Sequence, residues 1–436
     1  MKATLPLSCL CAVLLAAACT GEPSTPGTPA GPSLTVSGKV LDDSGQPIAN
    51  ASVLVLGPGR QPVKTDGTGA FRIPEVTAPY DIAATGSAEA VQVAVYQGVS
   101  RDNPTLIVSN PPGTSVSATV KGVISGGTTP YTSTRLPRVS FVSPRINALG
   151  GLEKLDGTYG AKVTWPGPAS LTGSLFAFEV EAASPFALPT NYLAYGRRDN
   201  VVLSPGATLA AQDLAMEPVT ASTLQGTLTL PSDYARPNLT VSLVMPSAII
   251  VPLFGEPSSA SSFSYKVPVI PQSSFTVSVT ASSSDASSYS TTLIQRGVLA
   301  GTPAQLVLQA APRPQQPADR ATDVTRSTEF SWEGYPDGLH GLSLSFVTGA
   351  PGSPVTRALT LYTNATRTVL PDLSALGWVY PASTPMSWRV SGYRPFSVDG
   401  LAGVQENQPV DAAFAGAAET VIGSSGSRQL TTSATP

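Results

Sequence analysis

Residues that could carry acid, base or nucleophilic chemistry are scarce in this chain of 436 residues. It contains one histidine, His340, and three cysteines, and its 28 acidic side chains are scattered. A histidine-based zinc site needs two or three imidazoles with carboxylates, so a single histidine excludes the common versions. His340 could act as the base for a serine nucleophile, but no G-x-S-x-G motif occurs. Its surroundings, PDGLHG at 336–341, predict a surface turn.

Carboxylates offer a second route to catalysis, because a glycosidase needs only two acids that face each other across a cleft. The one adjacent acidic pair, Asp42 and Asp43, stands just before Gly45. A calcium site is one interpretation, since hard cations prefer clustered oxygens. A hairpin turn is the other, and the lack of a third nearby acid favours it. We therefore expect no catalytic residues, no metal and no cofactor, and a carboxylate-based hydrolase is the least favoured function.

The N-terminal segment has the layout of an export signal. Lys2 precedes an apolar stretch, and three alanines at 16–18 precede Cys19. The apolar stretch is too short to cross a hydrocarbon core of roughly 30 Å, which needs about 20 apolar residues. We expect residues 1–18 to be removed as a signal peptide. Cys9 and Cys11 leave with it, so Cys19 is the one remaining cysteine and no intrachain disulfide can form.

The run LAAAC at 15–19 resembles the lipobox of bacterial lipoproteins. This resemblance implies that Cys19 is acylated and becomes the first residue of the mature protein, which attaches it to a membrane. Ala16 stands where the family most often has leucine, and ordinary signal-peptidase cleavage after Ala18 is the alternative. Thr20 follows the cysteine in place of an aspartate, and by resemblance to enterobacterial sorting this implies the outer membrane of the cell envelope.

The composition predicts an all-β protein of tandem antiparallel β-sandwiches. The chain has 42 prolines and 39 glycines, which interrupt helices, yet 42% of its residues are hydrophobic and occur in short alternating runs. Disorder is expected only in the flexible stalk at 19–32 and in the tail at 424–436. Only 12% of residues are charged, and loss of Lys2 changes the net charge from -3 to -4. No basic face for nucleic acid is indicated.

One pattern of alternating strands occurs three times and begins near Gly38, Gly122 and Gly226, at spacings of 84 and 104 residues (122 − 38 and 226 − 122). The segment FRIP at 71–74 aligns with 161–166 and with 265–268 inside the copies. Such spacing indicates tandem domains rather than solenoid repeats, and chance similarity among β sequences is the alternative. The predicted domains are 33–112, 113–218 and 219–311. A fourth predicted domain, at 312–423, has a different sequence pattern.

The first copy is similar to the carboxypeptidase regulatory-like domain. The similarity rests on GKV at 38–40, GQPI at 45–48, ASV at 51–53, TDG at 65–67 and GAF at 69–71. It implies a small transthyretin-like β-sandwich with a carbohydrate-binding-like fold. In carboxypeptidases this module accompanies the catalytic domain and carries no zinc ligands, so the resemblance does not imply hydrolysis.

The region after residue 311 resembles a fibronectin type III-like domain through FSW at 330–332 and MSWRV at 386–390. Trp332 and Trp388 are then core residues of an immunoglobulin-like sandwich, and a surface platform for sugar rings is the alternative. An apolar stretch at 243–254 is interrupted by Pro246 and Pro252. It predicts two buried strands joined at Pro246, with an exposed apolar loop as the alternative.

These observations favour a non-enzymatic, membrane-anchored surface lipoprotein that acts as a β-sandwich spacer or interaction scaffold. The second hypothesis is a carbohydrate-binding envelope lipoprotein. Its candidate ligand contacts are Trp165, Tyr131 and Tyr380, which stand in loop-like settings. The expected partners are the membrane, through the lipid on Cys19, and an envelope polysaccharide or protein, with no nucleic acid.

Overall fold

The computed structural model describes residues 33–435 apart from gaps at 87–90, 110–113, 145, 168, 247–248, 258–259, 285–287, 350–351 and 407–415. Nearly all regular structure in these residues is β-strand, which confirms the predicted all-β class. No helix in the described part of the chain is long and apolar enough to cross a membrane. The predicted signal peptide, Cys19 and the stalk lie outside the described residues.

The first sandwich contains β1 (Ser33–Leu41), β2 (Ser52–Val55), β3 (Val63–Lys64), β4 (Ala70–Thr77), β5 (Tyr80–Thr85), β6 (Gln92–Val99) and β7 (Thr105–Ile107). Strands β4, β1 and β7 form one sheet, and β6, β5, β2 and β3 lie side by side in the other. Its tight turns follow from the sequence, because an aspartate carboxylate can accept hydrogen bonds from the backbone two to four residues later. Asp42 binds the backbone nitrogens of Ser44 and Gln46 in this way, and Asp66 those of Thr68 and Ala70.

The second sandwich is built from β8 (Ser115–Ser125), β9 (Arg135–Val142), β10 (Asn147–Leu152), β11 (Thr158–Pro166), β12 (Leu171–Ala182), β13 (Pro189–Leu203), β14 (Thr208–Leu209) and β15 (Leu214–Pro218). The third is built from β16 (Ala221–Thr229), β17 (Tyr234–Val244), β18 (Ile250–Pro257), β19 (Ser262–Pro268), β20 (Ser274–Ser283), β21 (Ser290–Val298) and β22 (Ala304–Val307). Buried residues of both sandwiches belong to one hydrophobic cluster, which includes Phe178 and Tyr192 from the second and Val251 from the third.

The three glycines of the sequence repeat share one structural setting. Gly38, Gly122 and Gly226 each pair across an antiparallel ladder with an aromatic residue, which is Phe71, Tyr159 or Phe263. A Cβ added at the glycine would lie 2.6, 2.9 or 2.6 Å from a ring carbon of that residue, too close for any other amino acid. The spacing of the glycines therefore reflects a packing requirement of each sandwich. The predicted alignment of residue 71 with residues 161 and 265 is wrong by two positions. Tyr159 and Phe263 are the structural equivalents of Phe71, because they pair with the corresponding glycines.

The C-terminal region contains β23 (Arg313–Gln316), β24 (Ala321–Val324), β25 (Phe330–Glu333), β26 (Leu339–Thr348), β27 (Val355–Thr363), β28 (Arg367–Thr368), η2 (Ser374–Leu376), β29 (Pro385–Arg394), α1 (Val398–Leu401), β30 (Glu419–Ser424) and β31 (Arg428–Thr432). Trp332 and Trp388 are 3% and 1% exposed, so they are core residues and not a sugar platform.

The prediction of a disordered tail from residue 424 is wrong for its strand-forming part. Strand β31 pairs with β29 in antiparallel orientation and with β24 in parallel orientation. Leu430, in the middle of β31, is 2% exposed. A five-residue strand between polar segments gives a weak sequence signal, and its order comes from partners that lie far away in the chain.

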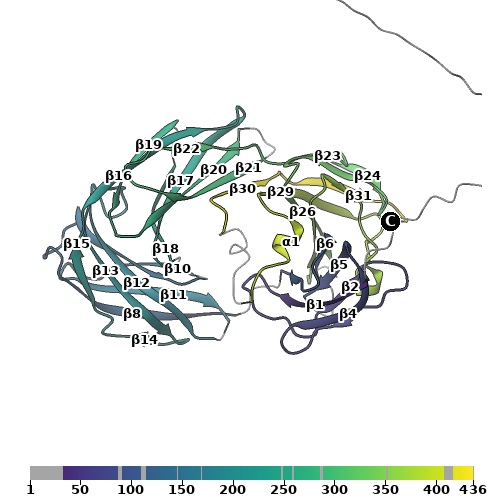
Figure 1. Ribbon diagram of the computed structural model, residues 1–436, viewed down its shortest axis with the longest axis horizontal. Helices are drawn as coiled ribbons and strands as arrows, with labels where there is room; N and C mark the ends of the chain where they lie inside the picture. The colour runs from purple at the N-terminus through teal and green to yellow at the C-terminus, as the bar shows by residue number, and fades with distance from the viewer. Residues whose placement is uncertain are drawn as a thin grey trace, which may run out of the picture.

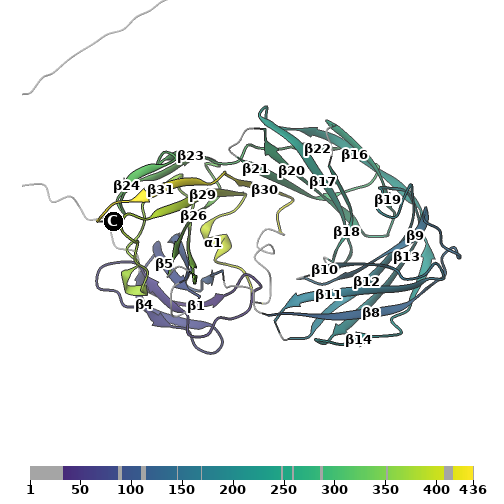
Figure 2. The same ribbon diagram turned by 180° about the vertical axis from the view of Figure 1, so that it is seen from behind.

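A single 14-stranded sheet passes through three of the four regions. Strand β30 pairs with β21 of the third sandwich, and β27 pairs in parallel with β6 of the first. Figures 1 and 2 show the result, in which the first sandwich and the C-terminal region form one lobe and the second and third sandwiches form the other. The chain thus turns back on itself, and its first described sandwich packs against its last region.

Helix α1 completes the hydrophobic core of the first sandwich. Its Val398 and Leu401 are 1% and 2% exposed and belong to the same buried cluster as Val36 and Phe71. The following residue, Ala402, accepts a hydrogen bond from the backbone nitrogen of Thr105 at 2.8 Å. The first sandwich therefore takes part of its core from the C-terminal region.

Candidate functional site

The three aromatic residues predicted to contact a ligand lie in hydrophobic cores. Trp165 on β11 is 4% exposed, Tyr131 is 1% exposed and Tyr380 is 6% exposed. Trp165 and Tyr131 belong to the core of the second sandwich, while Tyr380 belongs to that of the C-terminal region, so the fold does not bring the three together. Trp165 and Tyr131 do not line the groove described below, and Tyr380 lines only a cavity of about 10 Å³, so the predicted role as ligand contacts is wrong for these residues. Trp165 lies in β11, and the alternation of its neighbours in that strand is the sequence signal for its burial.

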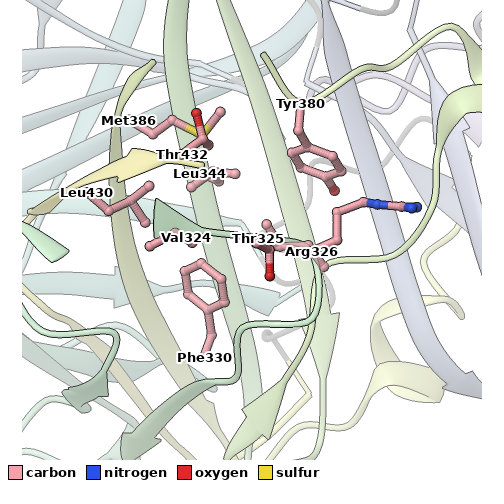
Figure 3. Close-up of a pocket in the computed structure, with 10 residues that line it drawn as sticks. Val324, Thr325, Arg326, Phe330, Leu344, Tyr380, Met386, Leu430 and Thr432 are labelled. Atoms are coloured by element: carbon pink, nitrogen blue, oxygen red, sulfur yellow. The ribbon is translucent and has the colours of Figure 1, made fainter. Parts of the chain in front are cut away.

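Tyr380 lines a small internal cavity under β31 (Figure 3). The side chains of Phe330, Leu344, Met386 and Leu430 converge on this space. Its volume is about 10 Å³, which is close to the minimum that holds one water molecule. The cavity is a packing defect and has no room for a sugar or a cofactor.

The prediction that His340 lies in a surface turn is wrong. The turn ends at Gly338, whose nitrogen donates to the carbonyl of Tyr335, and His340 is the second residue of β26. Its side chain is 0% exposed and packs against Trp332, with ring centroids 5.5 Å apart. Burial lowers the pKa of His340 to about 4. The imidazole is therefore neutral at pH 7 and shielded from any substrate.

The adjacent acids form a turn and not a cation site. One carboxylate oxygen of Asp42 accepts bonds from Ser44 and Gln46, while Asp43 accepts a bond from the Ser109 hydroxyl at 3.2 Å. Burial raises the pKa of Asp43, and the neighbouring charge of Asp42 adds to that increase. Across the described ranges, no group of three or more histidine, cysteine or acidic residues is placed to hold a metal.

A groove of about 890 Å³ separates the second sandwich from the third. One wall comes from β9, β10 and the 185–188 loop, and the other from β18. Figures 1 and 2 both show β10 and β18 next to each other at this boundary. The apolar stretch at 243–254 contributes the second wall. Its Leu243 and Val251 are buried as predicted, while Leu253 and Phe254 are only half-buried and line the groove.

Large apolar side chains remain exposed around this groove. Phe186 is 98% exposed, Leu149 is 76% exposed and Leu155 is 55% exposed, and all three line it. Exposed apolar residues that gather in one place mark an interaction site more often than scattered ones do. The sequence signal for this surface is the run PFAL at 185–188, an apolar segment in the loop between β12 and β13.

Two polar groups in the groove lack hydrogen-bond partners among the described residues. They are the hydroxyl of Tyr192 on β13 and the Nε of Arg138 on β9, both buried. A different nitrogen of Arg138 donates to the carbonyl of Ala187 and so fixes the side chain to the 185–188 loop. Burial raises the pKa of Tyr192 and lowers that of Arg138. The phenol is therefore protonated at pH 7, and both groups are hydrogen-bond donors with nothing to donate to.

The groove also contains one carboxylate, on Glu256 of β18. This carboxylate accepts a hydrogen bond from the hydroxyl of Tyr265 on β19. The hydrogen bond raises the pKa of Tyr265, although burial is the larger cause. Glu256 thus has a partner within its own sandwich, in contrast to the Tyr192 hydroxyl and the Nε of Arg138.

Comparisons with known proteins identify one part of the chain. No curated protein matches it. Among solved structures, a leucine-rich repeat protein from Bacteroides thetaiotaomicron is 12% identical over 44% of this chain and 26% of its own, with a TM-score of 0.17. The TIE protein of Bacillus anthracis is 11% identical over 64% of this chain and 50% of its own, with a TM-score of 0.15. The chain thus spans a half or less of these two proteins, and TM-scores this low identify no shared overall fold.

The family comparison agrees with the resemblance seen in the sequence. The model of the carboxypeptidase regulatory-like domain matches residues 35–108. This range runs from β1 to just beyond β7 and so covers the strands of the first sandwich. Residues 35–108 are therefore a carboxypeptidase regulatory-like domain, which is followed in the chain by further β-sandwich domains.

Proposed function

We propose that this protein is a non-catalytic β-sandwich scaffold, held in the bacterial envelope by a lipid on Cys19. The observation that carries this proposal is the way in which the first sandwich is built into the C-terminal region. Strand β6 adds to β27 over five residue pairs, from Gln92 with Ala358 to Tyr96 with Tyr362. A scaffold benefits from such a connection, because it fixes the domain nearest the anchor against the rest of the molecule.

Further contacts support a fixed connection. The backbone nitrogen of Ser100 donates to Asp399 of α1 at 2.8 Å, and the hydroxyl of Thr368 donates to the side chain of Gln97 at 2.9 Å. Inter-domain contacts that combine backbone pairing, a shared core and side-chain bonds resist the relative motions expected of loosely linked domains. The spacer hypothesis changes accordingly. The described domains form a folded-back platform, and any extended reach depends on the stretch before residue 33.

The environments of the candidate catalytic side chains support a non-catalytic role. His340 is buried and neutral, and the acidic pair at 42–43 is used by a turn. The regulatory-like module accompanies catalytic domains in carboxypeptidases without supplying their zinc ligands. Carbohydrate binding keeps no support from Trp165, Tyr131 or Tyr380, because all three are core residues. The exposed apolar groove favours an apolar partner instead.

Membrane fractionation of point variants tests the anchor. Cys19→Ser removes the only thiol that the lipobox places for acylation, so the protein should move from the membrane fraction to the soluble fraction and lose incorporation of labelled palmitate. Cys9→Ser is the matched control, since it removes a cysteine inside the predicted signal, and it should remain membrane-bound. Membrane association of Cys19→Ser equal to that of the control would contradict the anchor.

The non-catalytic assignment has a separate test. The purified full chain is incubated with peptide and polysaccharide substrates, and product formation is followed by mass spectrometry. We expect no turnover above that of a heat-unfolded sample. Turnover that a single substitution of an acidic residue abolishes would show an enzyme and end this part of the proposal.

A further inference from the structure

We infer that the groove between the second and third sandwiches binds an amphiphile with a carboxylate head and a long apolar body, as in a fatty acid. A scaffold needs no such ligand, so this inference goes beyond the proposed function. It rests on two features of the groove, its apolar walls and the pair of unused donors on Arg138 and Tyr192.

The walls of the groove are suited to an apolar body. Leu149 and Phe186 on one side and Leu253 and Phe254 on the other present aliphatic and aromatic surface to the same space. The volume of about 890 Å³ lies within the range of about 300–1,000 Å³ that is typical of small-molecule sites. Such sites are mostly apolar and contain a few polar groups that orient the ligand. Covering the exposed Phe186 would be favourable by the hydrophobic effect.

The two unused donors specify the head group. More than about 90% of buried polar groups in proteins have a hydrogen-bond partner, so each exception calls for an explanation. Tyr192 is 2% exposed, its hydroxyl has no partner among the described residues, and neither does the Nε of Arg138. A phenol and a guanidinium both donate, and the guanidinium carries a positive charge. A carboxylate accepts from both and neutralises that charge.

The edge of β18 argues against an extended peptide as the occupant. Strand β18 is the last strand of its sheet, so its outer edge is open. It contains Pro252 and Pro257, and its ladder with β17 is irregular between Val241 and Ser242. Prolines lack the backbone N–H, and prolines and irregular pairing are the features that prevent strand addition at sheet edges. A small amphiphile that fills the groove through side-chain contacts needs no such edge.

Binding of dodecanoate to the full chain tests the inference. The protein is produced without its lipid, and titration calorimetry is performed below the critical micelle concentration. We expect saturable binding of one dodecanoate per chain. Methyl dodecanoate has the same apolar body without the charge, and we expect it to bind about tenfold more weakly, because hydrogen bonds to charged groups are the stronger ones. Absence of saturable dodecanoate binding, or equal binding of the ester, would overturn the inference.

Tyr192→Phe removes the unused hydroxyl and leaves the ring in place. We expect affinity for dodecanoate to fall about tenfold while the unfolding midpoint stays unchanged, since the hydroxyl has no protein partner to lose. Tyr131→Phe is the matched control. It also removes a buried hydroxyl without a described partner, in the same sandwich but outside the groove. Equal affinities of these two variants would contradict the role of Tyr192.

A third variant addresses the wall of the groove without touching the core. Leu149 is 76% exposed, so Leu149→Asp should fold normally and place a charged side chain on the wall that contacts the apolar body of the ligand. We expect dodecanoate affinity to fall at least tenfold. Val347→Asp, at a site on β26 that is 59% exposed, serves as the control and should bind like the unmodified protein. Unchanged affinity of Leu149→Asp would place the ligand elsewhere and overturn the inference.

Discussion

Tyr96 and Tyr362 pack with ring centroids 5.0 Å apart, across the ladder that joins the first sandwich to the C-terminal region. The hydroxyl of Tyr96 also accepts a hydrogen bond from the backbone nitrogen of Ile107 at 2.8 Å. Both rings are buried or nearly so, and burial raises the pKa of each phenol. The carboxypeptidase regulatory-like domain at 35–108 therefore packs against residues of the C-terminal region, which lie outside the range that its family model matches.

Truncation of the α1 side chain should destabilise the first sandwich. Leu401→Ala removes a 2% exposed side chain from the core of that sandwich, and Leu to Ala changes in cores cost about 2–5 kcal/mol. The measurement is hydrogen exchange of the β5 and β6 amides together with urea unfolding. The control is Leu299→Ala, at a side chain that is 56% exposed, with an expected change of about 0.5 kcal/mol or less. Unchanged exchange in β5 and β6 of Leu401→Ala would show that the first sandwich is independent.

The ion pair of Arg135 with Glu179 should contribute more stability than surface pairs do. The Glu179 side chain is 1% exposed, and it accepts bonds from Arg135 Nε at 3.0 Å and from the Thr128 nitrogen at 3.1 Å. Arg135→Gln leaves that buried charge without its cation, and we expect a loss of about 1–3 kcal/mol in the free energy of unfolding.

The matched control for this pair is Lys121→Gln. It breaks the pair of Lys121 with Glu153, whose side chains are 45% and 41% exposed. Exposed pairs contribute about 0–1 kcal/mol, so the urea midpoint should hardly change. Adding Glu179→Gln to Arg135→Gln should recover part of the lost stability, because the buried charge is then absent. Equal effects of Arg135→Gln and Lys121→Gln would contradict the prediction.

The buried histidine should make the protein sensitive to acid. The pKa of His340 is about 4 in the folded protein and about 6.5 in the unfolded chain, so unfolded protein binds the proton first as the pH falls. The stability associated with a neutral His340 is complete above pH 6.5 and is lost as the pH falls towards 4. This difference in pKa between the folded and unfolded protein corresponds to a loss of about 3 kcal/mol in the free energy of unfolding.

Urea unfolding at pH 7.5, 6, 5 and 4 measures this loss. His340→Gln cannot titrate, so its stability should fall less between pH 6.5 and 4 than that of the unmodified protein. The comparison of slopes isolates His340 from the carboxylates, which titrate in both proteins. Parallel pH curves for the two proteins would show that His340 does not sense this range.

Strand β31 should be needed for the stability of the C-terminal region. Leu430 is 2% exposed and belongs to the cluster that contains Trp332 and Trp388. We expect Leu430→Ala to cost about 2–5 kcal/mol in urea unfolding monitored by tryptophan fluorescence. Val347→Ala, at a 59% exposed site, should change little. A variant that lacks β31 and unfolds like the unmodified protein would return this segment to the disordered tail that its sequence suggests.

The sequence by itself determined the features that depend on neighbouring residues. Alternation of apolar and polar side chains has a period of two, so it predicted strands and the all-β class without knowledge of strand partners. The aspartate at 42 predicted a turn because its bonds reach only two to four residues along the chain. The motifs around Gly38 predicted the regulatory-like domain, which the family model confirms at 35–108.

Only the tertiary structure decided which strands meet. Backbone hydrogen bonds are the same for every residue type, so no local pattern shows that β6 pairs with β27 or that β31 pairs with β24 and β29. The burial of His340 depends on Trp332 and Tyr335 packing over it after the fold forms. The groove arises in the same way, because Arg138 and Tyr192 come from different strands and the opposite wall comes from another sandwich.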